Sequence, residues 1–510
     1  MRLLRRNLFS TYFVYAVAFV VALVLTPVIV HALGKDAYGA WAFIGSATVV
    51  VSLLDLGVGP SIIRFGAHAR GRQDPEEINA LASVGLVVYA LIGAVSVAAG
   101  VVLAAVVPAL VSPLPHDLVW PVRVATLLVV VGIAAQFPLG LFNDLLLGQQ
   151  RYDLVNLGSL ARLTVYAALV GAILPRHGSV ALLAAFALVA TLVQLGLPLL
   201  WLRRELPFLR VSRSYVTRAR VRDLLAFSWH NFLIHIAAKI VFSADVLVVG
   251  IVLGPKAAAY YGLPSRIFGL VMGLGSGATD LLYPAFSELE GADELRRQQH
   301  LLLTGLRLGM VLMLLFALPL VLIPDLLIHG WIGPTWAPST WVLALLGVAL
   351  IVHQPANVIT QFLIARGRQA QLARLLLCVV GANLVLSIVL AWTVGLWGVA
   401  LATVVTESAA TLVFIPRFLN TSSHVDYRAL AASAARPVVP ALLAAGLVLV
   451  AYSRAFDPQT VLQLVAVGVL WVAAFVPAVW FLGLDPRERS LVTSRLGLPR
   501  LRREVAVEDL

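Results

Sequence analysis

The stretch "ALGKDAYGAW", Ala32 to Trp41, lies between two long apolar segments, and "VLGPKAAAYYG", Val252 to Gly262, repeats its pattern in the second half of the chain. Each has a Leu-Gly pair, then a lysine, then a Tyr-Gly pair. A second pair of similar segments follows in the same order, "LLLGQQRYDL" from Leu145 and "LIARGRQAQL" from Leu363. Similar segments in the same order indicate an internal duplication.

The composition around these segments is that of a membrane protein. Hydrophobic residues make up 61% of the 510 residues and charged residues only 12%, against about 25% in soluble domains. The mean hydropathy is +0.95. A helix needs about 20 apolar residues to cross the bilayer, and such runs recur along the chain. The sequence therefore predicts an all-α polytopic membrane protein with about fourteen transmembrane helices, in which the first run is a retained span and not a signal peptide.

A long Arg-rich polar segment follows the sixth predicted span and divides the chain into two parts. We expect two pseudo-symmetric bundles of about six helices, followed by two extra C-terminal helices. The expected boundaries are 1–205 for the first bundle, 206–223 for an Arg-rich cytoplasmic linker, 224–420 for the second bundle, 421–485 for the two added helices and 486–510 for a basic tail. Bundles with an even number of spans enter the membrane from the same side, and in such parallel repeats substrate sites lie between the halves.

The charges predict the orientation and exclude several functions. Most of the 37 lysines and arginines fall in alternate breaks, which places both termini in the cytoplasm. The net charge of +12 is thereby explained by topology and by anionic membrane lipids, without nucleic acid. Cys378 is the single cysteine, so internal disulfides are excluded. No phosphate-binding loop or metal-ligand spacing is present, and the outer breaks are short, so we expect no cofactor, no metal and no enzymatic activity.

Polar residues within the spans are candidates for function, because an ionisable group in hydrocarbon costs about 2.5–3.5 kcal/mol. In the seventh span, Asn231, His235 and Lys239 recur every four residues and so share one helix face. This face is either a cavity wall or a buried hydrogen-bonded stripe that holds helices together.

The tenth span has a second stripe, His353, Asn357 and Gln361, beside Pro355. Proline in a span implies a kink, which is either a hinge or a static bend.

The acidic residues within spans are Asp55, Asp245, Asp280 and Glu407. Asp245 needs a partner, and depth in the membrane favours Arg266. Asp55 and Asp280 occupy equivalent places in the two halves. Two further arginines, Arg162 and Arg307, lie near inner span ends, where we expect them to snorkel toward the interface.

Three segments resemble a known family. "LTPVIVHALGKDAYGAWAFIGSATVVVSLLDLGVGPSIIRF", Leu25 to Phe65, resembles the first two helices of bacterial oligosaccharide and polysaccharide flippases of the multidrug/oligosaccharidyl-lipid/polysaccharide exporter (MOP) superfamily. "SADVLVVGIVLGPKAAAYYGLPSRI", Ser243 to Ile267, and "LWGVALATVV", Leu396 to Val405, are similar to later segments of that family.

The resemblance implies a carrier in the bacterial plasma membrane that flips a polyprenyl-diphosphate-linked oligosaccharide from the cytoplasmic to the outer leaflet. It implies alternating access between two bundles, ion coupling by H+ or Na+, and the polysaccharide polymerase machinery as a candidate partner. The residues that it suggests for substrate binding are Lys239 and Arg266 for the diphosphate and His235, Asn231 and Tyr15 for the sugar. His353 and Asn357 are further substrate-binding candidates. Its candidates for ion coupling are Asp245, Asp55, Asp280 and Glu407.

Two alternatives remain open. One is an ion-coupled multidrug exporter of the same superfamily, which would use cavity carboxylates. The other is a membrane glycan ligase or polymerase, which would need a catalytic cluster on a large outer loop. Within the flippases, the first span, "FSTYFVYAVAFVVALVLTP" from Phe9 to Pro27, lacks the charged residues of the branch that flips the peptidoglycan precursor, and this disfavours that cargo.

Overall fold

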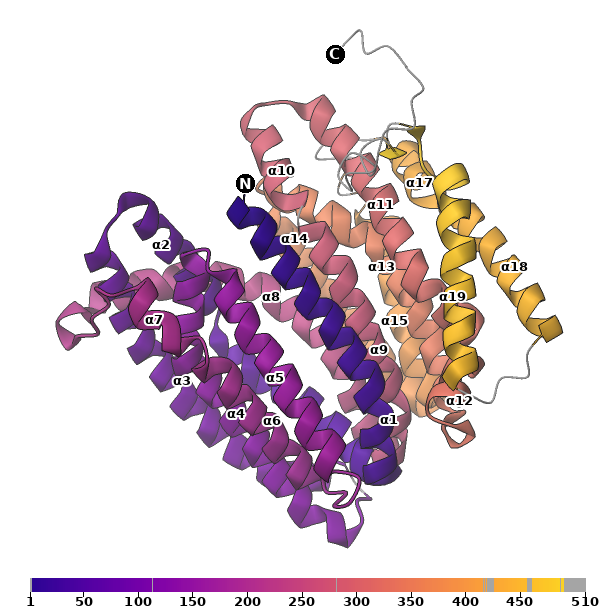
Figure 1. Ribbon diagram of the computed structural model, residues 1–510, viewed down its shortest axis with the longest axis horizontal. Coiled ribbons are helices and arrows are strands. Elements are labelled where there is room, and N and C mark those ends of the chain that lie inside the picture. The colour runs from indigo at the N-terminus through magenta and orange to yellow at the C-terminus, as the bar shows by residue number, and fades with distance from the viewer. Residues whose placement is uncertain are drawn as a thin grey trace. The chain divides into compact units, whose positions relative to one another are not determined.

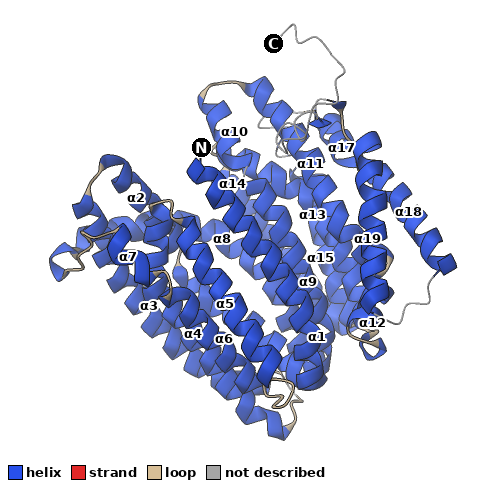
Figure 2. Ribbon diagram, viewed as in Figure 1, coloured by secondary structure: helices blue, strands red, loops and turns tan. Residues whose placement is uncertain are grey.

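The computed structural model describes residues 2–111, 113–280, 282–415, 417, 419, 426–455, 461–486 and 488–489. These residues form α-helices joined by short loops (Figure 1 and Figure 2). By their contacts they separate into two compact units, residues 1–270 with 373–403 and residues 271–372 with 404–510. These units do not coincide with the expected bundle boundaries, and the division into two six-helix bundles stays a prediction.

The first unit begins with the longest helix and continues through helices that pack side by side. Their bounds are α1 Arg2–Ser52, α2 Val58–Arg72, α3 Pro75–Leu110, α4 His116–Gly148, α5 Tyr152–Ile173, α6 Val180–Gly196, α7 Leu199–Glu205 and α8 Arg218–Leu253. Three later helices belong to both units, namely α9 Pro255–Asp280, α14 Gln369–Thr393 and α15 Leu396–Ala409. The second unit contains α10 Leu282–Gly291, α11 Leu295–Leu322, α12 Pro324–Trp331, α13 Ser339–Ala365, α17 Tyr427–Ala435, α18 Val438–Ala455 and α19 Val461–Ala478.

The helices confirm the polytopic membrane fold. In the described part of the chain, eleven helices are long and apolar enough to cross a membrane. This number counts α1 once, although Gly34 divides it into two helices, and it leaves out α8 and α9, which lie where the sequence predicts the seventh and eighth spans. If α1 is counted as two helices and α8 and α9 are added, the total agrees with the expected number of about fourteen spans.

The second span, which the sequence predicts near residues 39–63, is shorter in the structure. Its helix ends at Ser52, and a tight turn precedes α2. In this turn Leu56 has φ 51° and Gly57 has φ 75°. A left-handed backbone at leucine is unfavourable, so surrounding contacts must hold Asp55 and Leu56 in place.

The repeated sequence has a repeated backbone. Gly34 has φ 71° and ψ 178°, and Gly254, at the junction of α8 and α9, has φ 88° and ψ −179°. Only glycine adopts these angles readily, which explains why both copies keep a Leu-Gly pair.

The two copies also pack against each other within the first unit. A Cβ atom at Gly39 would overlap the carbonyl oxygen of Pro255, and one at Gly262 would lie 2.5 Å from the Cβ of Ala42. The ammonium group of Lys35 lies 5.3 Å from the ring centre of Tyr260, a cation–π contact between the same segments. Each copy therefore uses its own Tyr-Gly glycine to approach the other.

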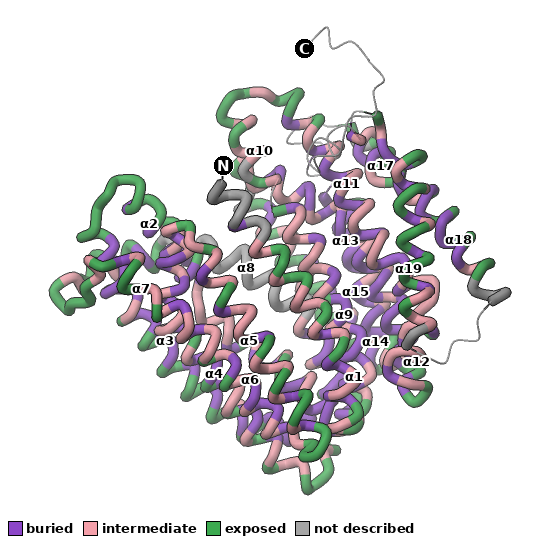
Figure 3. The backbone as a smooth tube through the Cα atoms, viewed as in Figure 1, coloured by how far each residue is buried: buried purple, intermediate pink, exposed green. Residues whose placement is uncertain are grey.

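Helices α3 and α4 pack closely against each other in the first unit. Gly85, Gly93 and Gly100 of α3 all face α4, where added Cβ atoms would collide with side chains or backbone. Small residues let membrane helices approach closely, since lipid supplies no hydrophobic driving force between them. Buried and exposed residues alternate along these helices (Figure 3).

The last two helices belong to the core of the second unit. Small and apolar residues of α18, including Ala441 and Ala445, pack with Trp471 and Phe475 of α19 against α11. The indole nitrogen of Trp471 donates a hydrogen bond of 2.7 Å to the backbone carbonyl of Leu315. The added helices are thus fixed to α11 by packing and by a buried polar contact.

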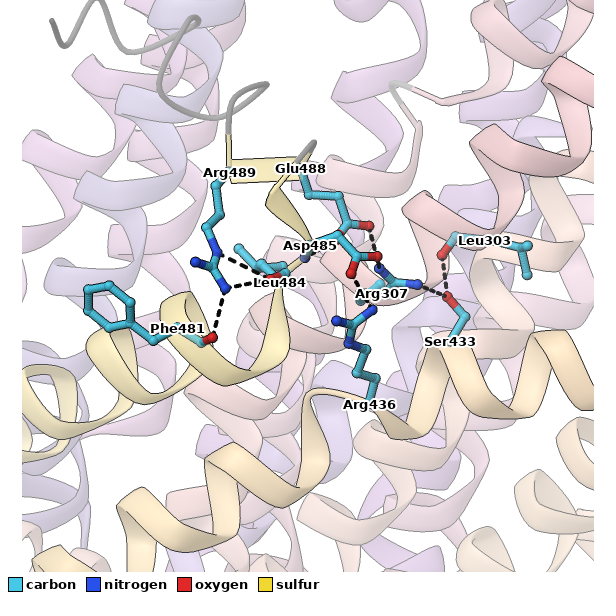
Figure 4. Close-up of polar contacts among 9 residues, drawn as sticks. All are labelled: Leu303, Arg307, Ser433, Arg436, Phe481, Leu484, Asp485, Glu488 and Arg489. Carbon is cyan, nitrogen blue, oxygen red and sulfur yellow. Dashed lines mark hydrogen bonds and ion pairs between the residues drawn. The ribbon is translucent and has the colours of Figure 1, made fainter. Parts of the chain in front are cut away.

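A group of charged residues at the end of α19 strengthens this attachment. Arg307 of α11 forms ion pairs with Asp485 and with Glu488, the latter at 2.9 Å, and Arg436 pairs with Asp485 at 2.6 Å (Figure 4). The side chain of Arg307 is 13% exposed. Arg307, which the sequence predicts to snorkel, has its guanidinium bound by two carboxylates beyond α19. We call these four residues the clasp.

Candidate functional site

Asp245 lies in a closed nest of hydroxyl groups in the first unit. Its carboxylate accepts hydrogen bonds from Tyr261 at 2.8 Å, from Ser387 at 3.1 Å and from Thr403 at 2.7 Å. Asp245 is 3% exposed and Ser387 and Thr403 are fully buried. Helices α8, α9, α14 and α15 each contribute one of these side chains, so a tilt of any one of them would disturb the nest.

The expected pairing of Asp245 with Arg266 is corrected by these contacts. Three neutral hydroxyls satisfy the carboxylate, and no cation of the described residues pairs with it. None of these three partners was predicted from the sequence, and one of them, Tyr261, belongs to the second copy of the repeated motif. Its hydroxyl reaches Asp245 because the two residues lie on either side of the Gly254 turn.

The charge of Arg266 acts instead on Arg162, Tyr38 and Tyr166. The Nε atom of Arg162 is buried and has no hydrogen-bond partner among the described residues. A guanidinium with a buried Nε that has no partner among the described residues, in electrostatic range of a second guanidinium, favours an anion. Arg162 was expected to snorkel and was missed as a site residue.

Asp55 shares a tyrosine with a second acid. The hydroxyl of Tyr89 lies 3.0 Å from a carboxylate oxygen of Asp55 and 3.3 Å from one of Asp144. A phenol has one proton to donate, so the second contact needs a proton on a carboxyl group. Asp144 was missed, although it meets the criterion that selected Asp55, an acid near the inner end of a span.

The predicted stripe on α13 is polar along its whole length in the second unit. His353 binds Glu407 with 2.9 Å between Nδ1 and Oε2, Asn357 donates to Thr279 at 2.9 Å, and Gln361 donates to Asp280 at 2.8 Å. Glu407 and Asp280, two of the predicted acids, are therefore both bound to this one helix face.

The remaining predicted site residues do not contact these groups, or their side chains are not among those that the structure describes. Asn231, His235 and Lys239 fall within α8, but their side chains lie outside the part of the chain that the structure describes. Tyr15 is 43% exposed on α1, with its ring edge-on to Tyr12 at 6.5 Å.

Comparison with protein families gives one match, to the family described as polysaccharide biosynthesis protein, over residues 4–290. This is more than half of the chain. The chain belongs to the polysaccharide biosynthesis protein family. No curated protein matches its sequence.

Solved structures of the MOP superfamily share the fold. The lipid II flippase MurJ in an inward closed conformation matches with a TM-score of 0.71 at 12% identity, covering 96% of this chain and 99% of its own. An inward-facing multidrug resistance MATE transporter matches with a TM-score of 0.63 at 15% identity, covering 80% of this chain and 96% of its own. A MOP superfamily transporter from Pyrococcus furiosus, whose binding pocket is described as having reverse polarity, matches with a TM-score of 0.57 at 14% identity, covering 84% and 96%. The chain is thus a polytopic membrane protein that shares the fold of these transporters.

Proposed function

We propose that this family member flips a polyprenyl-diphosphate-linked oligosaccharide from the cytoplasmic to the outer leaflet of the bacterial plasma membrane, with both termini in the cytoplasm. The observation that carries the proposal is the pair Arg162 and Arg266. A diphosphate crossing hydrocarbon needs cations that no acid has already neutralised, and Arg162 and Arg266 have no ion pair with an acid of the described residues.

The acids support the same conclusion. An exporter of cationic drugs needs carboxylates available to its cargo, whereas Asp245, Asp55 and Glu407 are engaged by hydroxyls, a phenol and an imidazole. The arginines are available to a cargo and these carboxylates are not, so the charges favour an anionic cargo.

The sugar needs hydrogen-bonding groups that replace water, since each unsatisfied polar group in hydrocarbon is costly. His353 and Asn357 line one polar face of α13, and Lys239, His235, Asn231 and Tyr15 are the further candidates. The polyprenyl chain stays in lipid throughout. Alternating access would carry the head group past these residues in turn.

The Asp245 nest is our candidate for the coupling ion. A carboxylate surrounded by three hydroxyl oxygens offers hard oxygen ligands to a small cation, and it equally accepts a proton. We expect Asp245→Asn to lose the response of transport to an imposed Na+ or H+ gradient.

The coverage of the solved structures adds support for a lipid-linked cargo. The lipid II flippase covers 96% of this chain and the MATE transporter 80%. The multidrug exporter nevertheless stays the second candidate, because several solved MATE transporters share the fold.

Deletion of the gene tests the proposal. We expect surface polysaccharide to disappear and its diphosphate-linked precursor to accumulate in the cytoplasmic leaflet. Arg162→Gln and Arg266→Gln should each reproduce the deletion. Arg176→Gln should complement it, because Arg176 is exposed and bonds only to the backbone at the end of α5. Unchanged polysaccharide with altered drug tolerance would instead support the multidrug exporter.

A further inference from the structure

A pocket lies where the first turns of α3 and α8 meet in the first unit. Its volume is about 500 Å³, including the space at its mouth. Two kinds of residue line it. The charged ones, which are exposed, are Glu77, Arg220 and Asp223, and the apolar ones are Phe65, Ala80, Leu81, Val84 and Leu224. The pocket therefore combines charges of both signs with an apolar wall.

The capping of both helices explains why charged residues of opposite sign meet here. Asp74 caps α3 by accepting a hydrogen bond of 3.0 Å from the backbone nitrogen of Glu77. Thr217 caps α8 in the same way, at 3.3 Å from the backbone nitrogen of Arg220. Glu77 and Arg220 are thus equivalent residues, each three positions after its cap. Because the two helices contact each other, their first turns bring a carboxylate and a guanidinium to one pocket.

The guanidinium of Arg220 is held in position and keeps donors for a ligand. Its Nη1 atom donates a hydrogen bond of 3.3 Å to the backbone carbonyl of Tyr215, and its central carbon lies 5.8 Å from the ring centre of the same tyrosine. A guanidinium has five N–H donors, so the bond to Tyr215 leaves others for a ligand. Such donors bind phosphate through paired hydrogen bonds.

The two carboxylates suit a cation that has N–H donors. Asp223 pairs with Arg222 at 3.5 Å, but the side chains are 69% and 78% exposed. Exposed ion pairs contribute little, so the ammonium group of a ligand can replace Arg222. A primary ammonium has three N–H donors and can donate to two carboxylates at once, whereas a quaternary ammonium has none.

The apolar wall continues into an exposed row of residues along α3. Val84 of the wall is buried, and the same helix face goes on through Val87, Leu91 and Val95, which are 47%, 66% and 49% exposed. These positions recur every three or four residues, so they lie in one row. From Val84 to Val95 the row is about 17 Å long, close to the hydrocarbon thickness of one leaflet, about 15 Å. An acyl chain on this row would have its head group at the pocket.

We propose that this pocket binds a phospholipid whose head group carries a phosphate and a primary ammonium, that is, a phosphatidylethanolamine. Arg220 binds the phosphate, Glu77 and Asp223 bind the ammonium, and an acyl chain lies along the exposed row of α3. An anionic lipid has no cation for the two carboxylates, and phosphatidylcholine has no N–H donor for them. The bound lipid joins the first turns of α3 and α8. This site is independent of the proposed cargo.

The first test uses the wild-type protein. The full-length chain in detergent micelles is titrated with lipids that share acyl chains and phosphate and differ in N-methylation, from phosphatidylethanolamine to phosphatidylcholine. Native mass spectrometry measures the bound lipid. We expect the affinity to fall several-fold along the series, because each methyl group removes an N–H donor. Phosphoethanolamine, the head group alone, should not compete at equal concentration, because it lacks the acyl chain.

Three results of this test would overturn the proposal. Equal affinities along the series would show that the ammonium is not recognised. Tighter binding of phosphatidylglycerol would show a site for anionic lipids. Competition by phosphoethanolamine at equal concentration would show a site for a soluble phosphate ester and not for a lipid.

The second test assigns the binding to this pocket. The double variant Glu77→Gln with Asp223→Asn should bind phosphatidylethanolamine and phosphatidylcholine equally, and Arg220→Gln should weaken both. The matched controls, Glu76→Gln and Arg218→Gln, change exposed charges of the same first turns that do not line the pocket, and they should keep the preference. All these side chains are exposed, so equal unfolding temperatures without lipid are expected. An unchanged preference in the double variant would place the lipid elsewhere and overturn the proposal.

Discussion

The hydroxyl of Thr403 lies 2.7 Å from the carboxylate of Asp245, although 158 residues separate them in the chain. The contact joins α15 to α8 inside the first unit, at the centre of a nest whose other donors come from α9 and α14. A buried carboxylate that depends on three hydroxyls from three helices makes the packing of those helices sensitive to each donor.

Thr403→Val removes one donor while keeping the shape of the side chain. Hydrogen bonds to charged groups contribute about 1.5–3 kcal/mol, so we expect the free energy of unfolding to fall by about that amount. Thermal unfolding in detergent measures it. Thr393→Val, which removes an exposed hydroxyl bonded to its own helix, should change stability little. Equal unfolding temperatures for the two variants would contradict the role of the nest.

Gly39→Ala should destabilise the protein, although alanine ordinarily favours a helix. Its Cβ would overlap the backbone carbonyl of Pro255, which cannot rotate away, and overpacking of this kind costs about 1–3 kcal/mol. Gly45→Ala in the same helix meets nothing within 4 Å and should be neutral or stabilising. Thermal unfolding of both variants checks the prediction, which fails if Gly39→Ala is the more stable.

Trp471→Phe should loosen the last two helices from α11. The substitution keeps most of the apolar contact and leaves the carbonyl of Leu315 without its indole donor, a loss of about 1 kcal/mol. Limited proteolysis within the region 452–462 should become faster. Trp392→Phe, at a position that is 74% exposed, is the control and should leave the cleavage rate unchanged.

Acid should weaken the clasp. Partial burial alone would raise the pKa of Asp485, but hydrogen bonds and charges of Arg307 and Arg436 outweigh it and hold the pKa below its ordinary value. A lowered pKa means that the stabilisation is complete above the ordinary value of about 4 and is lost as the pH falls through the folded-state value. Because Asp485 is 39% exposed, the effect should stay below about 1 kcal/mol.

The measurement is the unfolding temperature of the wild type and of Asp485→Asn between about pH 3 and about pH 7. The two curves should differ at neutral pH and converge in acid. Parallel curves over the whole range would show that Asp485 contributes no pH-dependent stability.

The fold followed from the sequence because apolar length is a direct physical requirement of the bilayer. The repeat of the Leu-Gly pairs at Gly34 and Gly254 could be recognised in the sequence, because a positive φ restricts the residue at such a position to glycine in most cases. The end of the second span could not be predicted, because Leu56 adopts a left-handed backbone and a leucine in the sequence gives no indication of that conformation.

The site was only partly predictable. The acids could be selected from the cost of burying charge, and the stripe of His353, Asn357 and Gln361 from its spacing. Their partners could not, because Ser387 and Thr403 look like ordinary small polar residues of a span until the helices are packed. Arg266 was expected to pair with Asp245 because the two residues lie at a similar depth along their spans. A similar depth does not show which helices are neighbours.

The matching angles of Gly34 and Gly254 bear on how such chains diverge. In two halves that descend from one sequence, most positions in the spans can be substituted by other apolar residues. A turn that only glycine adopts readily does not accept such substitutions. Traces of ancient gene doubling should therefore survive longest at backbone corners, and chimeras that exchange the two corner segments should still insert and fold.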